Sequence, residues 1–518
     1  MTRSIALSAL LCVLASLGSL RAQPSPPGDP AILTPKPGPA PRINGPSVYG
    51  CRPGHPFLYR IPVTGNRPMA FSAARLPDGL SLDATTGIIT GSIAAKGTFT
   101  VEVKAANGEG SAERSLRIVC GDTLALTPPM GWNDWYSDYS RISDERVRDA
   151  ANRMVENGMA DAGYQYVDID DCWSQIEKAR EGIEAAREGP GRDSAGNILP
   201  NRYFPDMKAL TDSIHAKGLK AGIYSSPGKT TCAGFAASYG HEAQDARQFA
   251  AWGFDLLKYD WCSYRAIVAA EALTVEAQQK PYRLMGGLIR AQNRDMILNL
   301  CQYGKADVWK WGEEVGAQSW RTSGDLGDHL DQIFEVALGN IAHGAWSKPG
   351  SWNDPDYIQI GWVGNDPVTG RAQQTKLSKD EQYAFMSLWS LMASPLFFSG
   401  DLTRMDAFTL SVLCNPEVIA VDQDPLGKCA HVVGAPGSTF VLVKELEGGT
   451  LAVGLCNRSH ASATAGVHWS QLGLTGRQSI RDLWREQMVG TFDGGFSAEV
   501  PPRGVMLIQV IPAAAAAN

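Results

Sequence analysis

The sequence has no excess of basic residues. It carries 47 lysines and arginines against 54 aspartates and glutamates, which gives a formal net charge of −7. A protein that binds nucleic acid needs a basic surface for the phosphates, so we expect no nucleic-acid partner. The chain also lacks a second long apolar run after its start, so no membrane span is predicted. A neutral ligand suits this charge better than an anionic one.

The one long apolar run stands at the start of the chain. Arg3 precedes an apolar stretch from Ile5 to Leu17, and Ser19 to Ala22 offers a cleavage site. This order is typical of a secretory signal peptide, which predicts a secreted or periplasmic protein. Residues 1–22 are therefore assigned to the signal, and the proline-rich residues 23–42 to an extended linker.

Polar residues end the apolar run LLKYDWC, from Leu256 to Cys262. Such a run is typical of a buried parallel strand, and in α/β folds the chemistry collects at the carboxyl ends of these strands. Lys258 and Asp260 lie two residues apart, so on a strand both point to the same side. An ion pair that only holds the strand end in place is an equally good interpretation of this segment alone.

Two further segments repeat the pattern. YQYVDIDDCW, from Tyr164 to Trp173, leads an apolar run into the adjacent carboxylates Asp170 and Asp171. LKAGIYSSPGKTTC runs from a predicted strand at Leu219–Tyr224 into a loop that ends at Cys232. Three strands that each end in polar or aromatic residues indicate a repeated β/α unit.

The helix before the second of these strands is well marked. Ser143 is a suitable N-cap, acidic residues follow in the first turn, and Gly163 lies beyond the expected end. One apolar face is formed by Val147, Ala151, Met154 and Val155. Strands that alternate with such helices predict an α/β fold with a parallel sheet, and the repeats between residues 128 and 410 suit a closed barrel.

Nine short motifs follow one another along this region. They are MGWNDW (130–135), IDDCW (169–173), GIY (222–224), KTTCAGF (229–235), LLKYDWC (256–262), WRTSGD (320–325), WNDPD (352–356), SPLFFSGDL (394–402) and DQDPLG (422–427). The ordered series resembles the signature set of glycoside hydrolase family 27, the α-galactosidase and α-N-acetylgalactosaminidase family. The resemblance implies a (β/α)8 TIM barrel at residues 122–424 and a C-terminal antiparallel β-sandwich at residues 425–518.

The resemblance also implies a retaining exo-glycosidase that removes terminal α-D-galactosyl residues from an oligosaccharide or polysaccharide, without a cofactor or metal. Asp260 matches the family's nucleophile and Asp325 its general acid/base. A retaining enzyme uses one carboxylate to attack the anomeric carbon and one carboxyl to protonate the leaving oxygen, about 5–5.5 Å apart. Lys258 is expected to keep Asp260 ionised and to donate to a sugar hydroxyl.

Other matched positions are expected to hold the sugar. Asp170 and Asp171 match the pair that grips the 4- and 6-hydroxyls of galactose, with Trp135 as an apolar wall. The remaining matched contacts are Tyr224, Arg321 and Asp356. A metal site at Asp168, Asp170 and Asp171 is a weak alternative, because neither histidine nor a further spaced acid supports it. For Asp354, a structural role is as good an interpretation as a functional one.

The departures from the family concern the substrate. Its fifth-strand motif reads Cys, then Glu or Asn, then Trp, where this chain has Cys301, Gln302 and Tyr303, followed after Gly by Lys305 and Ala306. In the animal enzymes this loop reads the 2-substituent of the sugar. Gln302 can still bond a hydroxyl, but the preference for hydroxyl or acetamido at carbon 2 stays open. α-N-Acetylgalactosaminidase, isomalto-dextranase and β-L-arabinopyranosidase activities are the alternatives.

The cysteines offer a second comparison with the family. The resemblance implies a disulfide between Cys232 and Cys262, beside the nucleophile. In the animal enzymes, cysteines at the positions of Ser140 and Ala317 pair with those that match Cys172 and Cys301. Cys172 and Cys301 are therefore expected to be free and buried, or paired in another way. The pairings left open are those of Cys172, Cys301, Cys414, Cys429 and Cys456.

Residues 43–121 form a separate short-strand segment, with runs such as FLYRIPV and GTFTVEVKAA and turn residues between them. The segment resembles the immunoglobulin-like modules often appended to exported bacterial enzymes. Cys51 and Cys120, near its two ends, could be joined. We expect a spacer or packing partner, with sugar binding as the alternative.

Two other classes of protein would leave different signs. A non-catalytic glycan-binding barrel would have lost one of the catalytic carboxylates, whereas Asp260 and Asp325 are both present. A metal-dependent hydrolase would lose its activity in the presence of a chelator, and no such loss is expected here. The oligomeric state stays open.

Overall fold

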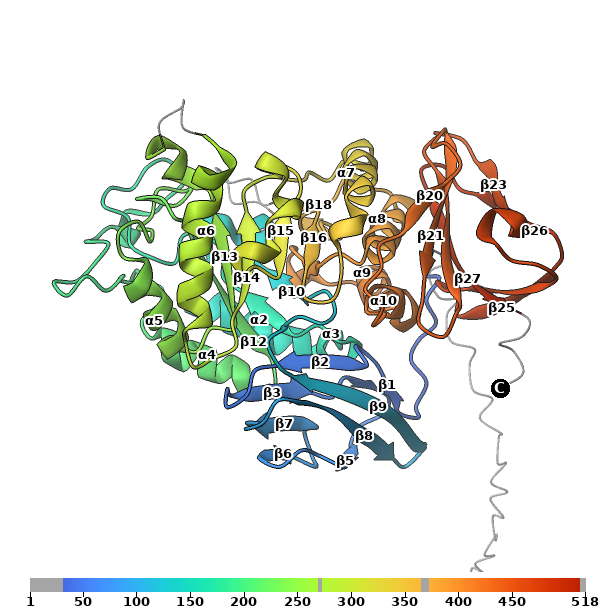
Figure 1. The fold of residues 1–518 in the computed structure, drawn as a ribbon, viewed down its shortest axis with the longest axis horizontal. Helices are drawn as coiled ribbons and strands as arrows, with labels where there is room; N and C mark the ends of the chain where they lie inside the picture. Colours follow the sequence, from blue (N-terminus) through green and yellow to red (C-terminus); the bar gives the residue numbers. More distant parts are fainter. Residues whose placement is uncertain (1–30, 269–272, 365–371, 513–518) are drawn as a thin grey trace, which may run out of the picture.

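The computed structural model describes residues 31–268, 273–364 and 372–512. The predicted signal peptide, the first part of the predicted linker and the terminal AAAAAN lie outside the described residues. A β module (blue), a central barrel and a C-terminal β domain (red) lie side by side (Figure 1). No helix within the described ranges has the length and hydropathy needed to cross a bilayer.

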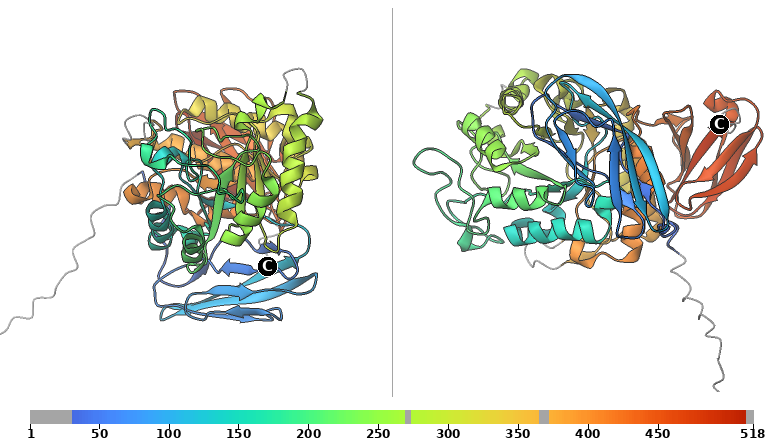
Figure 2. Two further views of the ribbon diagram at one scale, coloured as in Figure 1. Left: turned by 90° about the vertical axis from the view of Figure 1, so that its left-hand side faces the viewer. Right: turned by 90° about the horizontal axis from the view of Figure 1, so that it is seen from below.

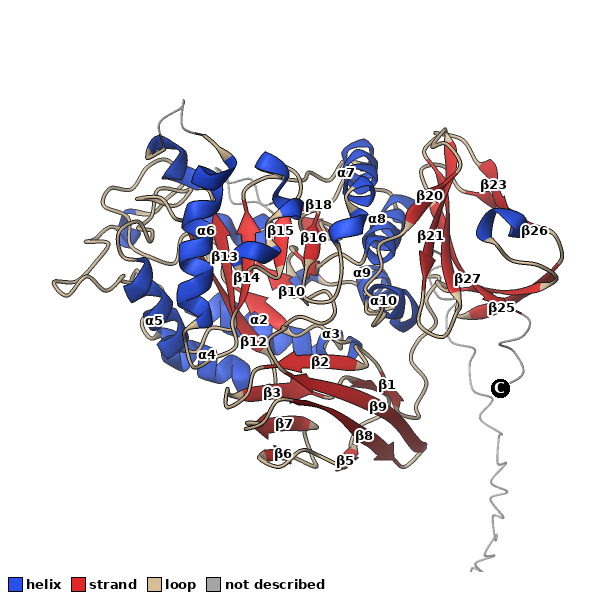
Figure 3. Ribbon diagram, in the orientation of Figure 1, coloured by secondary structure: helices blue, strands red, loops and turns tan. Residues whose placement is uncertain are grey.

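Eight parallel strands form the barrel wall, and helices lie outside them (Figure 3). The strands are β10 (Met130–Asn133), β11 (Tyr166–Asp168), β12 (Lys220–Ser225), β13 (Leu256–Asp260), β14 (Ile297–Cys301), β15 (Ser319–Arg321), β16 (Trp352–Asp354) and β19 (Leu396–Phe398). From β10 to β16 each strand pairs with the next one along the chain, and β19 pairs with β10, so β16 and β19 are the two ends of the sheet. Ile358 joins the two ends of the sheet, because its N–H donates to the Phe397 carbonyl at 2.7 Å and its carbonyl accepts from Ser399 N–H at 3.0 Å. The predicted barrel fold is confirmed.

Ten α-helices of the described residues follow the barrel strands, and local residues set where α2 begins and ends. They are α1 (Trp135–Asp138), α2 (Asp144–Glu156), α3 (Met159–Ala162), α4 (Met207–His215), α5 (Glu242–Trp252), α6 (Val275–Arg290), α7 (Leu330–Ala342), α8 (Lys379–Met392), α9 (Ala407–Leu413) and α10 (Pro416–Asp422). Ser143 caps α2 as predicted, since its Oγ accepts from Arg146 N–H at 3.3 Å. The helix ends well before Gly163, because Gly158 adopts a left-handed φ of 88° and separates α2 from α3.

Strand β13 shows how the barrel orients its polar side chains. All five of its residues are buried, as expected for a strand that is covered on both faces. Tyr259 packs outward, edge-to-face against Tyr282 of α6, with 6.0 Å between the ring centroids. Because side chains alternate along a strand, Lys258 and Asp260 point into the barrel, as predicted.

The N-terminal β module packs against the base of the barrel, where the strands begin (Figure 2). Its strands are β1 (Arg42–Ile43), β2 (Val48–Cys51), β3 (Phe57–Arg60), β4 (Val63–Thr64), β5 (Ala70–Ala74), β6 (Leu80–Leu82), β7 (Ile88–Gly91), β8 (Gly97–Asn107) and β9 (Gly110–Cys120). Arg52 Nε lies 2.8 Å from Asp295 Oδ1, and the same guanidinium donates to the carbonyls of Arg290 and Arg294. These contacts are those of a packing partner.

The two cysteines of this module are not joined. Cys51 and Cys120 face each other in the parallel pair β2–β9, and both are buried free thiols. The suggested closure of the module by a disulfide is not found.

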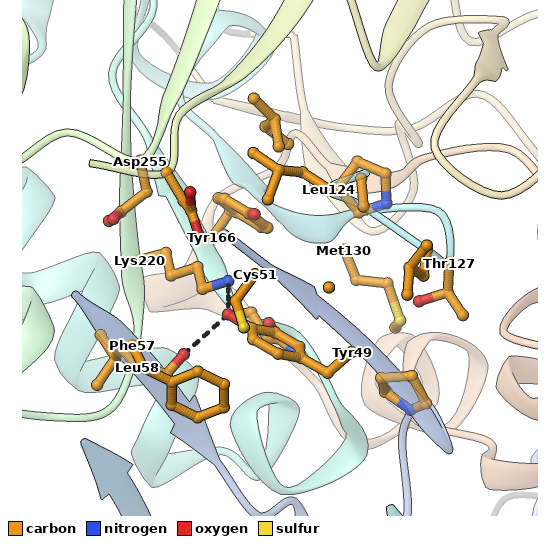
Figure 4. Close-up of a pocket in the computed structure, with 18 of the residues that line it drawn as sticks. Tyr49, Cys51, Phe57, Leu58, Leu124, Thr127, Met130, Tyr166, Lys220 and Asp255 are labelled. Atoms are coloured by element: carbon orange, nitrogen blue, oxygen red, sulfur yellow. Dashed lines mark hydrogen bonds between the residues drawn. The ribbon is translucent and has the colours of Figure 1, made fainter. Parts of the chain in front are cut away.

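A cavity of about 260 Å³ lies between this module and the barrel base (Figure 4). Lys220, at the start of β12, extends into it and donates to Tyr49 Oη of the module. Burial lowers the pKa of Lys220 to about 8. The cavity is lined by the first residues of several strands, so it lies at the opposite end of the barrel from Asp260.

The C-terminal domain has two antiparallel sheets that enclose an apolar core. The larger sheet contains β20 (His431–Val433), β21 (Thr439–Glu445), β22 (Leu451–Asn457), β24 (Gln478–Asp482), β25 (Gln487–Phe492) and β27 (Val505–Pro512), and the smaller contains β23 (Ala463–His468) and β26 (Gly495–Val500). Trp484 Nε1 donates to Ser387 Oγ of α8 at 2.9 Å, which fixes the domain to the barrel. The predicted C-terminal antiparallel β domain is confirmed.

Candidate active site

Asp260 lies at the carboxyl end of β13 with only 5% of its surface exposed. Each of its oxygens accepts a hydrogen bond from a tyrosine. Tyr224 Oη donates to Oδ2 at 3.0 Å, and Tyr303 Oη donates to Oδ1 at 2.6 Å. Burial raises the pKa of Asp260, while Lys258 and the Tyr303 hydroxyl oppose that rise. The carboxylate is thus held in one orientation by two donors.

Lys258 forms an ion pair with Asp170. Its Nζ lies 2.7 Å from Asp170 Oδ2, and Asn133 Nδ2 donates to the same oxygen at 2.9 Å. The sequence predicts that Lys258 keeps Asp260 ionised, but the direct ion-pair partner of Lys258 is Asp170. Its influence on Asp260 is the attraction between unlike charges, which lowers the pKa of that carboxyl.

Asp171, next along the chain, is held by the backbone. It accepts from Cys172 N–H at 2.7 Å and from Ala233 N–H at 2.8 Å. Burial raises its pKa to about 7, and the hydrogen bonds it accepts limit the rise. Near neutral pH this carboxyl can therefore either donate to or accept from a ligand hydroxyl.

A second ion pair joins the ends of β15 and β16. Arg321 Nη2 lies 3.1 Å from Asp356 Oδ2 and 3.3 Å from Asp325 Oδ1. Tyr136 Oη also donates to Asp356 Oδ2, at 2.9 Å. Burial raises the pKa of Asp356 to about 6. Arg321 Nε and Asp356 Oδ1 are buried with no hydrogen-bond partner among the described residues, so both remain available to a ligand.

Asp325 differs from the other acids of the site because its side chain is 62% exposed. It follows β15 on a loop, at the open end of the barrel. Burial and the negative charges of neighbouring groups, Asp260 and Asp325 among them, raise the pKa of Tyr303. The charges of both carboxylates, buried Asp260 and exposed Asp325, therefore act on the Tyr303 hydroxyl.

A disulfide joins Cys232 to Cys262 and links the loops after β12 and β13, as predicted. Tyr224 Oη lies 3.1 Å from Cys262 Sγ, and Tyr303 Oη lies 3.6 Å from Cys232 Sγ. The two tyrosines that bind Asp260 therefore also contact the disulfide. The free cysteines of this part of the chain are Cys172, Cys301, Cys414, Cys429 and Cys456, of which Cys172 and Cys301 are buried, as expected.

The loop after β14 holds Gln302 below the surface. Gln302 Nε2 donates to the Lys305 carbonyl, and its Oε1 is buried without a partner in the described part of the chain. Lys305 itself is exposed, and Ala306 adopts a left-handed φ of 53°. The Gln302 oxygen is thus left for a ligand, and Nε2 has a second N–H beyond the one that it donates to Lys305. Trp135 is half-buried after β10, with its ring edge-to-face on Tyr139.

The contacts of Asp354 are structural. It accepts from Asn299 Nδ2 at 2.8 Å and from Asp356 N–H at 2.9 Å, and so ties β14 to β16. The metal-site alternative at Asp168, Asp170 and Asp171 gains no support, because lysine, asparagine and backbone donors already occupy the oxygens of Asp170 and Asp171.

Four residues of the site were given no role from the sequence: Asn133, Tyr136, Tyr303 and Tyr357. Tyr357 lies under the Lys258 ammonium, with 4.8 Å between Nζ and the ring centroid. Three of the four lie in or beside the motifs MGWNDW and WNDPD, which was a usable signal. Tyr303 stands where the family motif has tryptophan, so the motif gives no signal for its hydroxyl.

A closed parallel barrel that gathers a buried, tyrosine-bound carboxylate and an exposed carboxylate at its strand ends defines a glycoside hydrolase of the TIM-barrel class. The profile of the family described as "Alpha galactosidase A" matches residues 127–424, and the chain belongs to this family, glycoside hydrolase family 27. The profiles described as "Alpha galactosidase C-terminal beta sandwich domain" and "Putative Ig domain" match residues 436–510 and 40–121.

Curated relatives and solved structures agree with this assignment. An α-galactosidase of Oryza sativa subsp. japonica is 36% identical over 81% of this chain and 92% of its own length. An "Alpha-galactosidase A" of Cellvibrio japonicus is 33% identical over 76% of this chain and 93% of its own. The crystal structure of a "putative alpha-galactosidase/melibiase" from Bacteroides fragilis matches with a TM-score of 0.83 at 34% identity, over 93% of this chain and 99% of that one.

Proposed function

We propose that the chain is an exported, retaining exo-glycosidase that hydrolyses terminal α-D-galactosyl residues, with Asp260 as nucleophile and Asp325 as general acid and base. The observation that carries this proposal is the contrast between the two carboxylates. Asp260 is buried and bound by two hydroxyls, whereas Asp325 is exposed at the mouth and reached by Arg321. The names of the relatives support the α-galactoside as substrate.

In the first half of the reaction an oxygen of Asp260 bonds to the anomeric carbon, and the bond from that carbon to the aglycone oxygen breaks. Asp325 gives its proton to the departing oxygen. In the second half Asp325 takes a proton from water, whose oxygen bonds to the anomeric carbon while the bond to Asp260 breaks. The electron pair of that bond returns to the Asp260 carboxylate, and the configuration of the sugar is retained.

Recognition of galactose is assigned to the groups around the Lys258–Asp170 pair. Asp170 and Asp171 would bind the 4- and 6-hydroxyls, and Lys258 has further N–H groups for a hydroxyl beyond its bond to Asp170. A sugar with the opposite configuration at carbon 4 would leave a buried carboxylate without its partner. Trp135 would cover the apolar face of the ring.

Other residues would bind the remaining sugar hydroxyls. The buried atoms Arg321 Nε and Asp356 Oδ1, which lack partners among the described residues, suit the 2- and 3-hydroxyls. Tyr224 supports the nucleophile, and Gln302 offers its Oε1 near carbon 2.

The domain boundaries and the export of the protein belong to the same proposal. We assign residues 1–22 to a signal peptide, 23–42 to a linker, 43–121 to the β module, 122–424 to the catalytic barrel and 425–518 to the C-terminal β-sandwich. Mass spectrometry of the protein recovered from the medium or periplasm tests the first boundary, with Gln23 as the expected first residue. Retention of full-length protein in the cytoplasm would contradict export.

The experiment that tests the activity is nitrophenol release from four glycosides: α-D-galactoside, α-N-acetyl-D-galactosaminide, β-L-arabinopyranoside and α-D-glucoside. We expect cleavage of the α-galactoside above the other three. Preferential cleavage of the acetamido sugar or the arabinopyranoside would keep the mechanism and replace the substrate. No cleavage of any of the four would contradict the proposal.

A further inference from the structure

The two oxygens of Asp260 have separate tyrosine partners from different parts of the barrel. Tyr224 belongs to β12, whereas Tyr303 belongs to the loop after β14 and makes the shorter bond, 2.6 Å against 3.0 Å. Where this chain has Tyr303, the motif that it otherwise resembles has tryptophan, which carries no hydroxyl. Tryptophan can donate only through its indole N–H, so a phenol hydroxyl on Asp260 Oδ1 depends on the tyrosine of this chain.

The backbone around Tyr303 is held in an unusual conformation. Tyr303 has a φ of 64° and Gly304 a φ of 76°, both in the left-handed region that side chains with a Cβ rarely adopt. A Cβ at Gly304 would lie 2.2 Å from the Thr322 carbonyl oxygen. Strain of this kind persists where the surroundings enforce it, often at functional sites. Here it brings the Tyr303 hydroxyl to 2.6 Å from Asp260 Oδ1 and to 3.6 Å from Cys232 Sγ.

We propose that Tyr303 is a positioning residue that makes Asp260 a better leaving group in the second half of the reaction. This inference rests on the proposed retaining mechanism, in which Asp260 becomes an ester and is then released. A hydrogen bond to a carboxylate is stronger than one to the neutral carbonyl of an ester. The Tyr303 hydroxyl therefore stabilises free Asp260 more than the glycosyl-enzyme.

The consequence differs between the two steps. In the first step the Tyr303 hydrogen bond weakens as the carboxylate loses its charge, so the hydroxyl slows attack. In the second step the electron pair of the breaking carbon–oxygen bond returns to the carboxylate, and the same hydrogen bond strengthens. Removal of the hydroxyl should therefore slow release of the sugar from Asp260 and leave its transfer to Asp260 intact or faster.

The surroundings of Asp260 give a second, independent expectation for pH. Burial raises the pKa of Asp260, Lys258 lowers it, Asp170 raises it, and the hydrogen bonds from Tyr303 and Cys301 lower it. Tyr224, from β12, faces it as a neutral donor. Loss of the Tyr303 hydroxyl removes one of the groups that keep Asp260 ionised, so the acid limb of kcat/KM should move to higher pH.

The test compares the full chain with Y303F and with Y259F, a control whose ring packs on the outer side of the same strand. The substrate is 2,4-dinitrophenyl α-D-galactoside, whose leaving group needs no acid, so the first step is fast and the acid limb reports Asp260. For Y303F we expect kcat to fall about tenfold or more with a parallel fall in KM, a burst of dinitrophenol, and a hexosyl adduct in the intact mass during turnover. Y259F should match the wild type.

The outcomes separate this inference from the function on which it rests. Wild-type kcat and no accumulating adduct in Y303F would overturn the role of Tyr303 while the α-galactosidase activity stands. A fall in kcat/KM without a burst or a shift of the acid limb would mean a merely structural role, and would also overturn it. Y303L, a second variant whose side chain carries no hydrogen-bond donor, should accumulate the same adduct. A wild-type chain that releases no dinitrophenol would contradict the proposed function itself.

Discussion

Charged side chains are buried at both ends of the barrel: at the base, where the strands begin, and at the rim, where they end. The pKa of the buried carboxyl differs between the two ends. At the base, Asp255 is bound on both oxygens, by His215 at 2.8 Å, by Ala221 N–H at 2.9 Å and by Arg294 at 2.5 Å. Burial alone would raise the pKa of Asp255, but His215 and Arg294 hold it below its ordinary value. At the rim, burial prevails and the pKa of Asp260 is raised despite Lys258.

This difference shows which charges serve the fold and which await a ligand. The base network, with Asp255, His215 and Arg294, satisfies its polar groups within the protein. The rim leaves Arg321 Nε and Asp356 Oδ1 buried without partners among the described residues. Unsatisfied buried groups and raised carboxyl pKa values concentrate at functional sites, where binding of the ligand completes the network. Variants at the two ends should therefore fail in different ways.

The largest effect is expected from Asp260→Asn. Loss of the nucleophile removes the covalent route and should lower kcat for a nitrophenyl α-galactoside by about 10⁴-fold or more. The thermal midpoint should stay the same or rise, because a buried negative charge is removed. Steady-state kinetics and calorimetry on the same preparation check both parts. A variant that is inactive and also strongly destabilised would contradict the claim that Asp260 at the rim serves activity and not stability.

Asp255→Asn should do the reverse. It removes one partner from a buried network and leaves the positive charge of Arg294 without compensation, which typically costs about 3–5 kcal/mol of stability. Denaturant unfolding measures this loss, and activity per folded molecule should be unchanged. A stable variant with lost activity would contradict the assignment of the base to stability.

Asp171→Asn tests the sign of the pH dependence at the rim. The pKa of Asp171 is about 7 in the folded protein against 3.8 as its ordinary value, so the folded state holds a proton that the unfolded state releases. Ionisation therefore destabilises the wild type as pH rises from about 4 to 7, by up to about 4 kcal/mol. The stability of the variant relative to the wild type should rise over that window in chemical denaturation. A difference that is flat with pH would refute the raised pKa.

The smallest effect is expected from Ser143→Ala, which should lower stability and leave activity unchanged although Ser143 lies at the rim. Ser143 lies at the rim end of α2, where its Oγ caps the helix and contacts Arg146 N–H. Ser143→Ala should cost about 1 kcal/mol of stability. The kcat and KM for an α-galactoside should not change. A clear loss of activity would place the start of α2 within the catalytic machinery.

Much of this organisation was predictable from the sequence, because its strands and motifs are local. The apolar run before Lys258 and Asp260 predicted a strand end, and alternation along that strand predicted that both point inward. The partner of Lys258 could not be predicted, because Asp170 lies 88 residues away and meets it only when the barrel closes. The role of Tyr303 could not be predicted either. Its hydrogen bond to Asp260 depends on a left-handed backbone conformation at Tyr303, which no sequence pattern indicates.

The fate of the module cysteines shows a further limit. Cys51 and Cys120 do come together, as their positions near the two ends suggested. Both nevertheless stay free thiols in the structure. A disulfide also needs a suitable Cβ separation and torsion angle, which no sequence pattern sets. The proximity of the two cysteines could be predicted from the sequence, whereas their bonding state depends on side-chain geometry.

The most direct test of the account is to identify the residue that becomes covalently bound to the sugar. The wild-type chain is incubated with 5-fluoro-α-D-galactosyl fluoride, digested, and mapped by tandem mass spectrometry. The account predicts a single fluorogalactosyl adduct on the peptide that contains Asp260. An adduct on another carboxylate, or hydrolysis of α-galactosides without any adduct, would contradict it.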